Sequence, residues 1–186
     1  VREMTKSAIR LAGKSGRDRF SGLPDVQPSI PPALDIYDPA ILEMSPQSAV
    51  TMALEAEKAA LETDKRITNS DGASLGASAS NWVLANSSGI LYEARATSCS
   101  LSCAPVAEQG SEKQVGYFWS SGRYLDDLDS PAEIGAAAAA RTIRKLGARK
   151  VETQVAPVIF DWMAGPTLWA PLFQALDGDS AHRGLS

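Results

Sequence analysis

The sequence predicts an α+β fold in which an antiparallel sheet packs against two amphipathic helices. Two observations lead to this prediction. Two segments carry apolar residues at helical spacing and have well-defined starts, and the segments between them are rich in serine, alternate in polarity and contain few helix-forming residues. The order helix, three or four strands, helix favours a sheet that rests on both helices.

The first expected helix begins at Ser45, a favourable N-cap residue, with Pro46 at the first helical position. Helical spacing continues to about Thr63. The apolar side consists of Ala49, Val50, Ala53, Leu54 and Leu61, and the polar side carries Glu55, Lys58 and Glu62. An amphipathic helix of this kind is expected to turn its apolar side toward the core.

The second expected helix begins at Ser130, which forms a capping box with Glu133 and is followed by Pro131. It runs to Gly147, a typical C-terminal glycine. Gly135 and the five alanines that follow it at residues 136–140 make a thin helix face. Such a face can lie close against a sheet or another helix.

The expected strands cover residues 81–86, 91–106 and 114–124, where serine, aromatic residues and alternation are frequent. Residues 86–89 and 108–111 have the composition of turns. We therefore expect neighbouring strands to pair as antiparallel hairpins.

The stretch RITNSDGASLGASASNWVLANSSG, from Arg66 to Gly89, is poor in charge and rich in small residues. It lacks the GK[ST] ending of a phosphate loop, and it contains no G-x-G-x-x-G between a strand and a helix. Residues 69–72 suit a tight turn with Gly72 in a left-handed conformation. We expect that turn to lead into a strand over residues 73–80.

The ends of the chain are less regular. Met4, Ile9 and Leu11 indicate a helix at the start, and residues 13–39 are rich in proline and glycine, as an irregular connection would be. The chain starts at Val1 inside this helix and ends without a terminating element. We expect it to be a piece of a longer protein.

Beyond the second helix the sequence predicts a strand over residues 151–160 and a helix over residues 167–176. The expected division is therefore an N-terminal segment with its connection (residues 1–44), a central α+β domain (residues 45–149) and the beginning of a C-terminal domain (residues 150–186).

Composition excludes several classes of function. The net charge is −4 and the sequence has no stripe of Lys and Arg, so we expect no nucleic-acid partner. It has no apolar run of membrane-spanning length and no signal-type start. The expectation is a soluble, cytoplasmic protein without a membrane segment.

Cys99 and Cys103 lie four residues apart in an expected strand, which places them on one face but roughly 13 Å apart, too far for a disulfide. We expect two free thiols in the core. His182 is the single histidine of the chain, so the two cysteines lack the partners of a zinc site.

Several motifs occur in an order that resembles the TldD/PmbA family. They are SPQSA with EAEKAAL, the stretch from Arg66 to Gly89, SLSCAPVAE, YFWSSGR, and LGARK before PVIFD. Members of this family were named modulators of DNA gyrase and are understood as metallopeptidases. The resemblance implies an N-terminal α/β domain joined to a mostly β C-terminal domain, of which this chain would hold only the beginning, and it implies dimers.

The resemblance also allows a test for a metal site. In the TldD branch a zinc motif, HExxxH, precedes a Gly-Asp pair, and its glutamate is the base for a metal-activated water. Alignment on Gly178-Asp179 places Trp169, Ala170 and Gln174 at the positions of the first histidine, the glutamate and the second histidine, in that order. None of the three can act as a zinc ligand or as the catalytic base, so we expect no catalytic residue and no metal ligand in this chain. This pattern resembles the PmbA (TldE) branch.

The leading hypothesis is a non-catalytic subunit of a metallopeptidase that degrades or processes unfolded peptides. Zinc would then be held by a TldD-like partner subunit, and the choice between a homodimer and a heterodimer stays open. A strand edge that pairs with an extended peptide is one physical means of holding the substrate. The sequence does not identify the peptide-binding residues.

Two alternatives remain. One is a regulatory protein that interacts with DNA gyrase, as the family's older name suggests. The other is a self-sufficient hydrolase with a Ser or Cys nucleophile, for which His182 is the candidate base.

Overall fold

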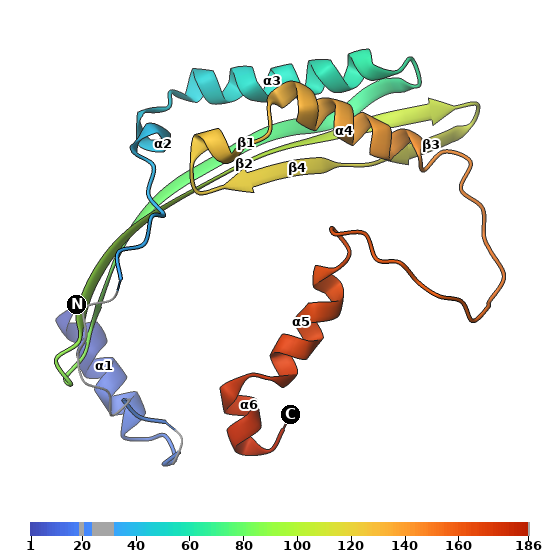
Figure 1. The fold of residues 1–186 in the computed structure, drawn as a ribbon. Helices are drawn as coiled ribbons and strands as arrows, with labels where there is room; N and C mark the ends of the chain where they lie inside the picture. Colours follow the sequence, from blue (N-terminus) through green and yellow to red (C-terminus); the bar gives the residue numbers. More distant parts are fainter. Residues whose placement is uncertain (19–20, 24–31, 186) are drawn as a thin grey trace. The chain divides into compact units, whose positions relative to one another are not determined.

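A computed structural model describes residues 1–18, 21–23 and 32–185. The chain forms two compact units: residues 28–151, and residues 1–27 together with 152–186. The first of these, here called the α/β unit, has an antiparallel sheet with helices on one face (Figure 1). The predicted α+β class is confirmed.

The sheet is built around one long hairpin. Strands β1 (Ile67–Ala85) and β2 (Leu91–Gln109) pair antiparallel along their whole length. The short strands β3 (Glu112–Val115) and β4 (Phe118–Gly122) both pair with the other side of β2. Strand β1 therefore forms one edge of the sheet. The hairpin extends beyond the helices and curves away from them, so the face opposite the helices is concave (Figure 1).

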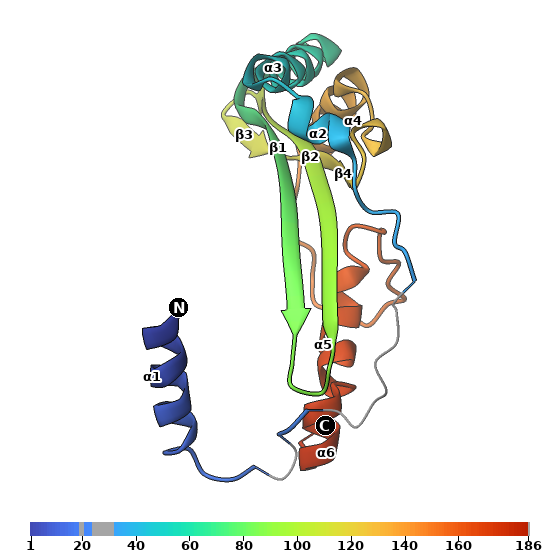
Figure 2. The same ribbon diagram turned by 90° about the vertical axis from the view of Figure 1, so that its left-hand side faces the viewer.

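Two helices cover the convex face, and their starts agree with the sequence. Helix α3 (Pro46–Thr63) is capped by Ser45, and helix α4 (Pro131–Ile143) is capped by Ser130 in a reciprocal capping box with Glu133. Four residues of irregular turn follow α4 and end at Gly147, whose φ is +76°. α3 packs mainly over β1, and α4 packs mainly over β2 and β4 (Figure 2).

The core lies between this helix layer and alternate residues of β2. The buried side chains of β2 are Thr97, Cys99, Leu101, Cys103, Pro105 and Ala107. Small residues bring the helices close: a Cβ on Gly135 of α4 would lie 2.2 Å from the carbonyl oxygen of Ala56 in α3. The thin face expected around Gly135 is thus confirmed.

Several expectations for the strands were wrong. Residues 73–80 and 81–85 are not separate strands but parts of β1, because β1 pairs with β2 without interruption from Gly72 to its end at Ala85. Gly72 does have a positive φ, +127°, but it sits at a register shift and not in a tight turn. Residues 114–124 divide into β3 and β4.

The buried side of α3 also differs from the expected one. Ala56 and Ala60 are fully buried, whereas Val50, Leu54 and Leu61 are exposed. The reason is the close contact with α4, which only the alanine side of α3 allows. A short helix that the sequence analysis missed, α2 (Pro39–Glu43), is capped by Asp38.

The second unit contains helices and irregular segments in its described part. Helix α1 (Arg2–Ala12) confirms the expected N-terminal helix, and α5 (Pro166–Ala175) matches the one expected over residues 167–176. Helix α6 (Gly178–Arg183) follows it. Residues 151–160 form no strand, which corrects that prediction, because no neighbouring strand pairs with them.

The connection expected over residues 13–39 contains no helix or strand in its described part before Pro39, where α2 begins. Residues 19–20 and 24–31 of this connection lie outside the described residues. The division at residues 44 and 149 stays a prediction. Within the described ranges, none of the helices has the length and apolar character needed to span a membrane.

Candidate functional site

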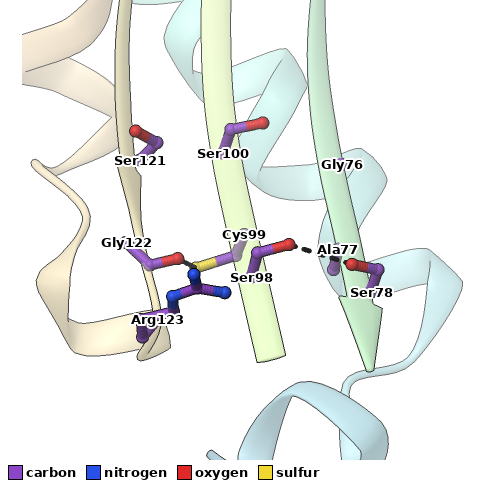
Figure 3. Close-up of a pocket in the computed structure, with 9 residues that line it drawn as sticks. All are labelled: Gly76, Ala77, Ser78, Ser98, Cys99, Ser100, Ser121, Gly122 and Arg123. Atoms are coloured by element: carbon purple, nitrogen blue, oxygen red, sulfur yellow. Dashed lines mark hydrogen bonds between the residues drawn. The ribbon is translucent and has the colours of Figure 1, made fainter. Parts of the chain in front are cut away.

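The concave face of the sheet carries an open hollow of about 700 Å³ (Figure 3). Its floor is formed by β1, β2 and β4, where side chains alternate between the helix face and the concave face. The lining residues with a hydroxyl or a charged group are Ser78, Ser98, Ser100, Ser121 and Arg123, and the lining residues without a side chain are Gly76 and Gly122. The hollow is therefore polar and shallow, with one cation at its end.

Hydroxyl pairs bridge the two long strands across this face. Ser78 and Ser98 lie opposite each other with their Oγ atoms 2.9 Å apart, and the Oγ atoms of Ser74 and Ser102 are 3.1 Å apart. Such cross-strand pairs fix the register of the hairpin. Because these side chains are small, the backbone beneath them stays accessible.

Arg123 is held in place by a partly buried network of hydrogen bonds. Its Nη1 donates to the carbonyl oxygen of Thr97 over 3.0 Å, and its own carbonyl oxygen accepts from the Thr97 hydroxyl over 2.7 Å. The backbone N–H of Asp38 donates to that same hydroxyl over 2.8 Å. The Asp38 carboxylate accepts from Leu125 N over 2.8 Å and from Ala40 N over 2.9 Å. Three distant segments are thereby tied together beside the hollow.

The two cysteines do not supply a nucleophile. Both are free and buried, as predicted, and both point toward the helix face. Cys99 Sγ donates to the carbonyl oxygen of Tyr124 over 3.2 Å, and Cys103 Sγ donates to that of Ala56 over 3.8 Å. Burial raises the pKa of both thiols, that of Cys103 to about 11. Neither forms a reactive thiolate near neutral pH.

The candidate base, His182, and the two cysteines belong to different units of the chain. His182 lies in α6, in the second unit, while Cys99 and Cys103 are enclosed in the core of the α/β unit. A Ser or Cys hydrolase needs its base within hydrogen-bond reach of the nucleophile. The burial of both thiols gives a hydrolase with a cysteine nucleophile no support.

The three positions aligned with the zinc motif all fall on α5. Trp169, Ala170 and Gln174 are exposed there, and the Trp169 ring lies 6.3 Å from that of Phe173, centroid to centroid. Tryptophan and alanine have no metal-binding atom, and one amide is a poor zinc ligand. Among the described residues no cluster of three or more His, Cys, Asp or Glu could hold a metal ion. The side chains at these three positions do not fit the zinc that the HExxxH motif of the TldD branch would hold.

The sequence analysis identified no residue of the hollow. Alternating serines over residues 98–102 and 74–80 were a visible signal for one uniform strand face. Arg123 carried no such signal, because it joins these serines only through the pairing of β4 with β2.

Comparison with known sequences places this fold in a family. The profile of the PmbA/TldA metallopeptidase central domain matches residues 39–146. The chain is 35% identical over 185 residues to a protein of Escherichia coli O157:H7 named metalloprotease PmbA, and the match covers 98% of this chain. A homologue of that name from Haemophilus influenzae is 29% identical over 188 residues and is matched by 100% of this chain. The chain spans 41% of the length of each relative.

Solved structures of other proteins show the same fold. A proposed modulator of DNA gyrase from Bacteroides thetaiotaomicron superposes with a TM-score of 0.84 at 27% identity, covering 96% of this chain and 41% of the other. TldE from Thermococcus kodakarensis superposes with a TM-score of 0.58 at 21% identity, covering 76% of this chain and 30% of the other, a likeness that shows the fold alone. From its sequence and its central domain, this chain belongs to the PmbA/TldD family of metallopeptidases.

Proposed function

We propose that this chain is part of a PmbA- or TldE-like, non-catalytic subunit of a cytoplasmic metallopeptidase that degrades or processes peptides. One observation carries the proposal: α5 presents Trp169, Ala170 and Gln174 where the resemblance expects the zinc ligands and the base. Membership in the family makes that expectation relevant to this chain.

The chemistry of peptide hydrolysis explains why a second subunit is needed. Cleavage requires an activated water and stabilisation of the oxyanion, and in this class a metal ion supplies both. The described residues offer no ligand set for that metal. A TldD-like subunit with an intact HExxxH would therefore provide the reaction, and this subunit would complete the particle.

The concave hollow is the surface that suits an unfolded peptide best. The hydroxyls of Ser100 and Ser121 line the hollow and form no hydrogen bond with the described residues, so they can accept from or donate to a peptide backbone. Arg123 adds a cation that the Thr97 carbonyl already holds in position. None of these groups selects a particular side chain, which fits the handling of peptides of varied sequence.

The test is reconstitution with the full-length protein. It should show negligible peptidase activity alone and activity when mixed with a TldD-like subunit that carries HExxxH. Replacing the glutamate of that motif in the partner should abolish cleavage, because the base is lost. Gln174→Ala in this chain should leave most of the activity. Robust peptidase activity from this protein alone, resistant to chelators, would refute the proposal.

A further inference from the structure

We propose that the hollow on the concave face binds the C-terminal carboxylate of a peptide, through the guanidinium of Arg123 and the hydroxyls of Ser100 and Ser121. The inference rests on the proposed function, which makes a peptide the ligand of this surface, and it goes further by naming the part of the peptide that is held. Its test measures binding and not cleavage.

The first observation is an interruption in the row of serine pairs on the concave face. On either side of the interruption, a hydroxyl of β1 and a hydroxyl of β2 bond each other. Between those two pairs Ser100 lies opposite Gly76, which has no side chain to bond it. On its other side Ser100 lies opposite Ser121 of β4. Because side chains that face each other across two strands are close, the hydroxyls of Ser100 and Ser121 can bond one ligand atom together.

The second observation is the cation beside these hydroxyls. Arg123 directly follows β4 and lies two residues from Ser121, so their Cα atoms are about 7 Å apart. Its side chain extends from β4 toward β2, beside Ser98 (Figure 3). Nη1 donates to the carbonyl oxygen of Thr97, and the other guanidinium N–H groups have no partner among the described residues. None of the ion pairs between described residues includes Arg123, so the cation is positioned without being paired.

The acidic side chain nearest in sequence points to the other face of the strand. Asp127 Oδ2 accepts from the main-chain N–H groups of Arg123 and Tyr124 over 3.1 and 3.0 Å. The Asp127 side chain lies where a Cβ on Gly122 would point, and Gly122 shares the helix face with its buried strand partner Cys99. The carboxylate is therefore on the helix side, whereas the guanidinium lines the concave side.

These groups fit a carboxylate that lies on the floor of the hollow. One of its oxygens would accept from the two serine hydroxyls, and the other would accept from the guanidinium. A carboxylate with a hydrogen bond at each oxygen spans roughly 8 Å, which is close to the spacing of Ser121 and Arg123. Hydrogen bonds between charged groups are about twice as strong as neutral ones. Because the Thr97 carbonyl already restrains the guanidinium, binding orders little additional side chain.

The shallow floor favours a terminal carboxylate over an acidic side chain. The residues of the floor are small, so a peptide main chain that lies on them can reach the hydroxyls directly. An internal Asp or Glu carboxylate directed at the same groups would hold its own main chain away from the sheet by the length of its side chain. A terminal carboxylate has no such spacer. It is also common to all peptides, which fits a surface without a pocket for a particular side chain.

Fluorescence anisotropy with the full-length protein tests the choice of ligand. The probe is a short, unstructured peptide of Gly, Ser and Ala with a fluorophore at its N-terminus, prepared with a free C-terminal carboxylate and with a C-terminal amide. The free acid should bind at least about tenfold more tightly, because the amide lacks the charge. Equal affinities, or no binding of the free acid below about 1 mM, would overturn the proposal. An amidated peptide with one internal Asp that binds as tightly as the free acid would also overturn it.

Two variants test the location of the site. Arg123→Gln should lower the affinity for the free acid about tenfold and leave that for the amide nearly unchanged. Arg95→Gln, at an exposed arginine of β2 on the helix face, is the matched control and should change neither affinity. Gly76→Ser gives Ser100 a partner across the strands and should weaken binding of the free acid about threefold. The fold accommodates this serine, because a Cβ at Gly76 meets only Ser100 Oγ, at 3.6 Å.

An undiminished preference for the free acid in both Arg123→Gln and Gly76→Ser would contradict the site. Failure of the site is distinguishable from failure of the proposed function. If the acid and the amide bind equally while the reconstituted pair of subunits still cleaves peptides, only the carboxylate site is wrong. If the preference for the acid depends on Arg123 while the mixture with a TldD-like subunit is inactive, the site is supported and the proposed subunit role is wrong.

Discussion

Gly135→Ala should destabilise the α/β unit although it introduces a better helix former. Within a helix, alanine is favoured over glycine by about 1 kcal/mol. The new Cβ, however, would lie 2.2 Å from Ala56 O and 2.9 Å from both Ala59 Cβ and Ala60 N, whereas ordinary contact begins at 3.4 Å. The two helices must separate by about 1 Å, and overpacking of this kind costs about 1–3 kcal/mol.

The obstacle at Gly135 is main chain, which cannot rotate away, so the upper part of that range applies and the net loss should be about 2 kcal/mol. Urea unfolding followed by far-UV circular dichroism should show a midpoint lower by about 1 M. Ala136→Gly, at the exposed neighbouring position, should cost about 1 kcal/mol through helix propensity alone. If Gly135→Ala proved as stable as the parent, the packing of α4 on α3 described above would be incorrect.

Two further predictions concern polar groups. Ser130→Ala removes the N-cap of α4 and the hydrogen bonds of the Ser130 side chain with Glu133, so it should lower the free energy of unfolding by about 1 kcal/mol in the same urea assay. Ser121→Ala, at an exposed strand position, should lower it by less. Equal losses for the two variants would contradict the role of Ser130 as N-cap. Hydrogen bonds from Arg66 lower the pKa of Asp64 to about 2 in the folded protein. Because the carboxyl has a pKa of about 4 in the unfolded chain, the pair stabilises the fold at pH values above 4, and this stabilisation is lost as the pH falls toward 2. Arg66→Met should return the Asp64 pKa, measured by carboxyl NMR titration, toward 4; an unchanged pKa would contradict the pairing.

The sequence predicted those parts of the fold that depend on local signals. The starts of α3 and α4 were identified because Ser45 with Pro46, and Ser130 with Glu133, satisfy helix-terminal N–H groups within one turn. The same reasoning was wrong at Gly72, because a glycine with positive φ is needed equally in a tight turn and in a bulge. Only the pairing of β1 with β2, which is a long-range property, distinguishes a bulge from a tight turn at this glycine.

Burial was harder to predict than helix limits. Periodicity assigned Val50, Leu54 and Leu61 to the core, but the contact with Gly135 turns the alanine side of α3 inward. The hydrophobicity of the side chains does not show that α3 and α4 approach each other closely, or that this approach buries small alanines in place of larger apolar side chains. The hollow was missed for a related reason, since Arg123 meets its serines only after β4 has paired with β2.

Metal analysis of the purified full-length protein tests the central claim most directly. Because Trp169, Ala170 and Gln174 occupy the positions of the zinc motif, the protein expressed in zinc-supplemented medium should hold well below one zinc per chain after dialysis. A TldD-like subunit treated in parallel is the positive control and should retain its metal. About one tightly bound zinc per chain in this protein, lost on His182→Ala, would contradict the account of a metal-free subunit.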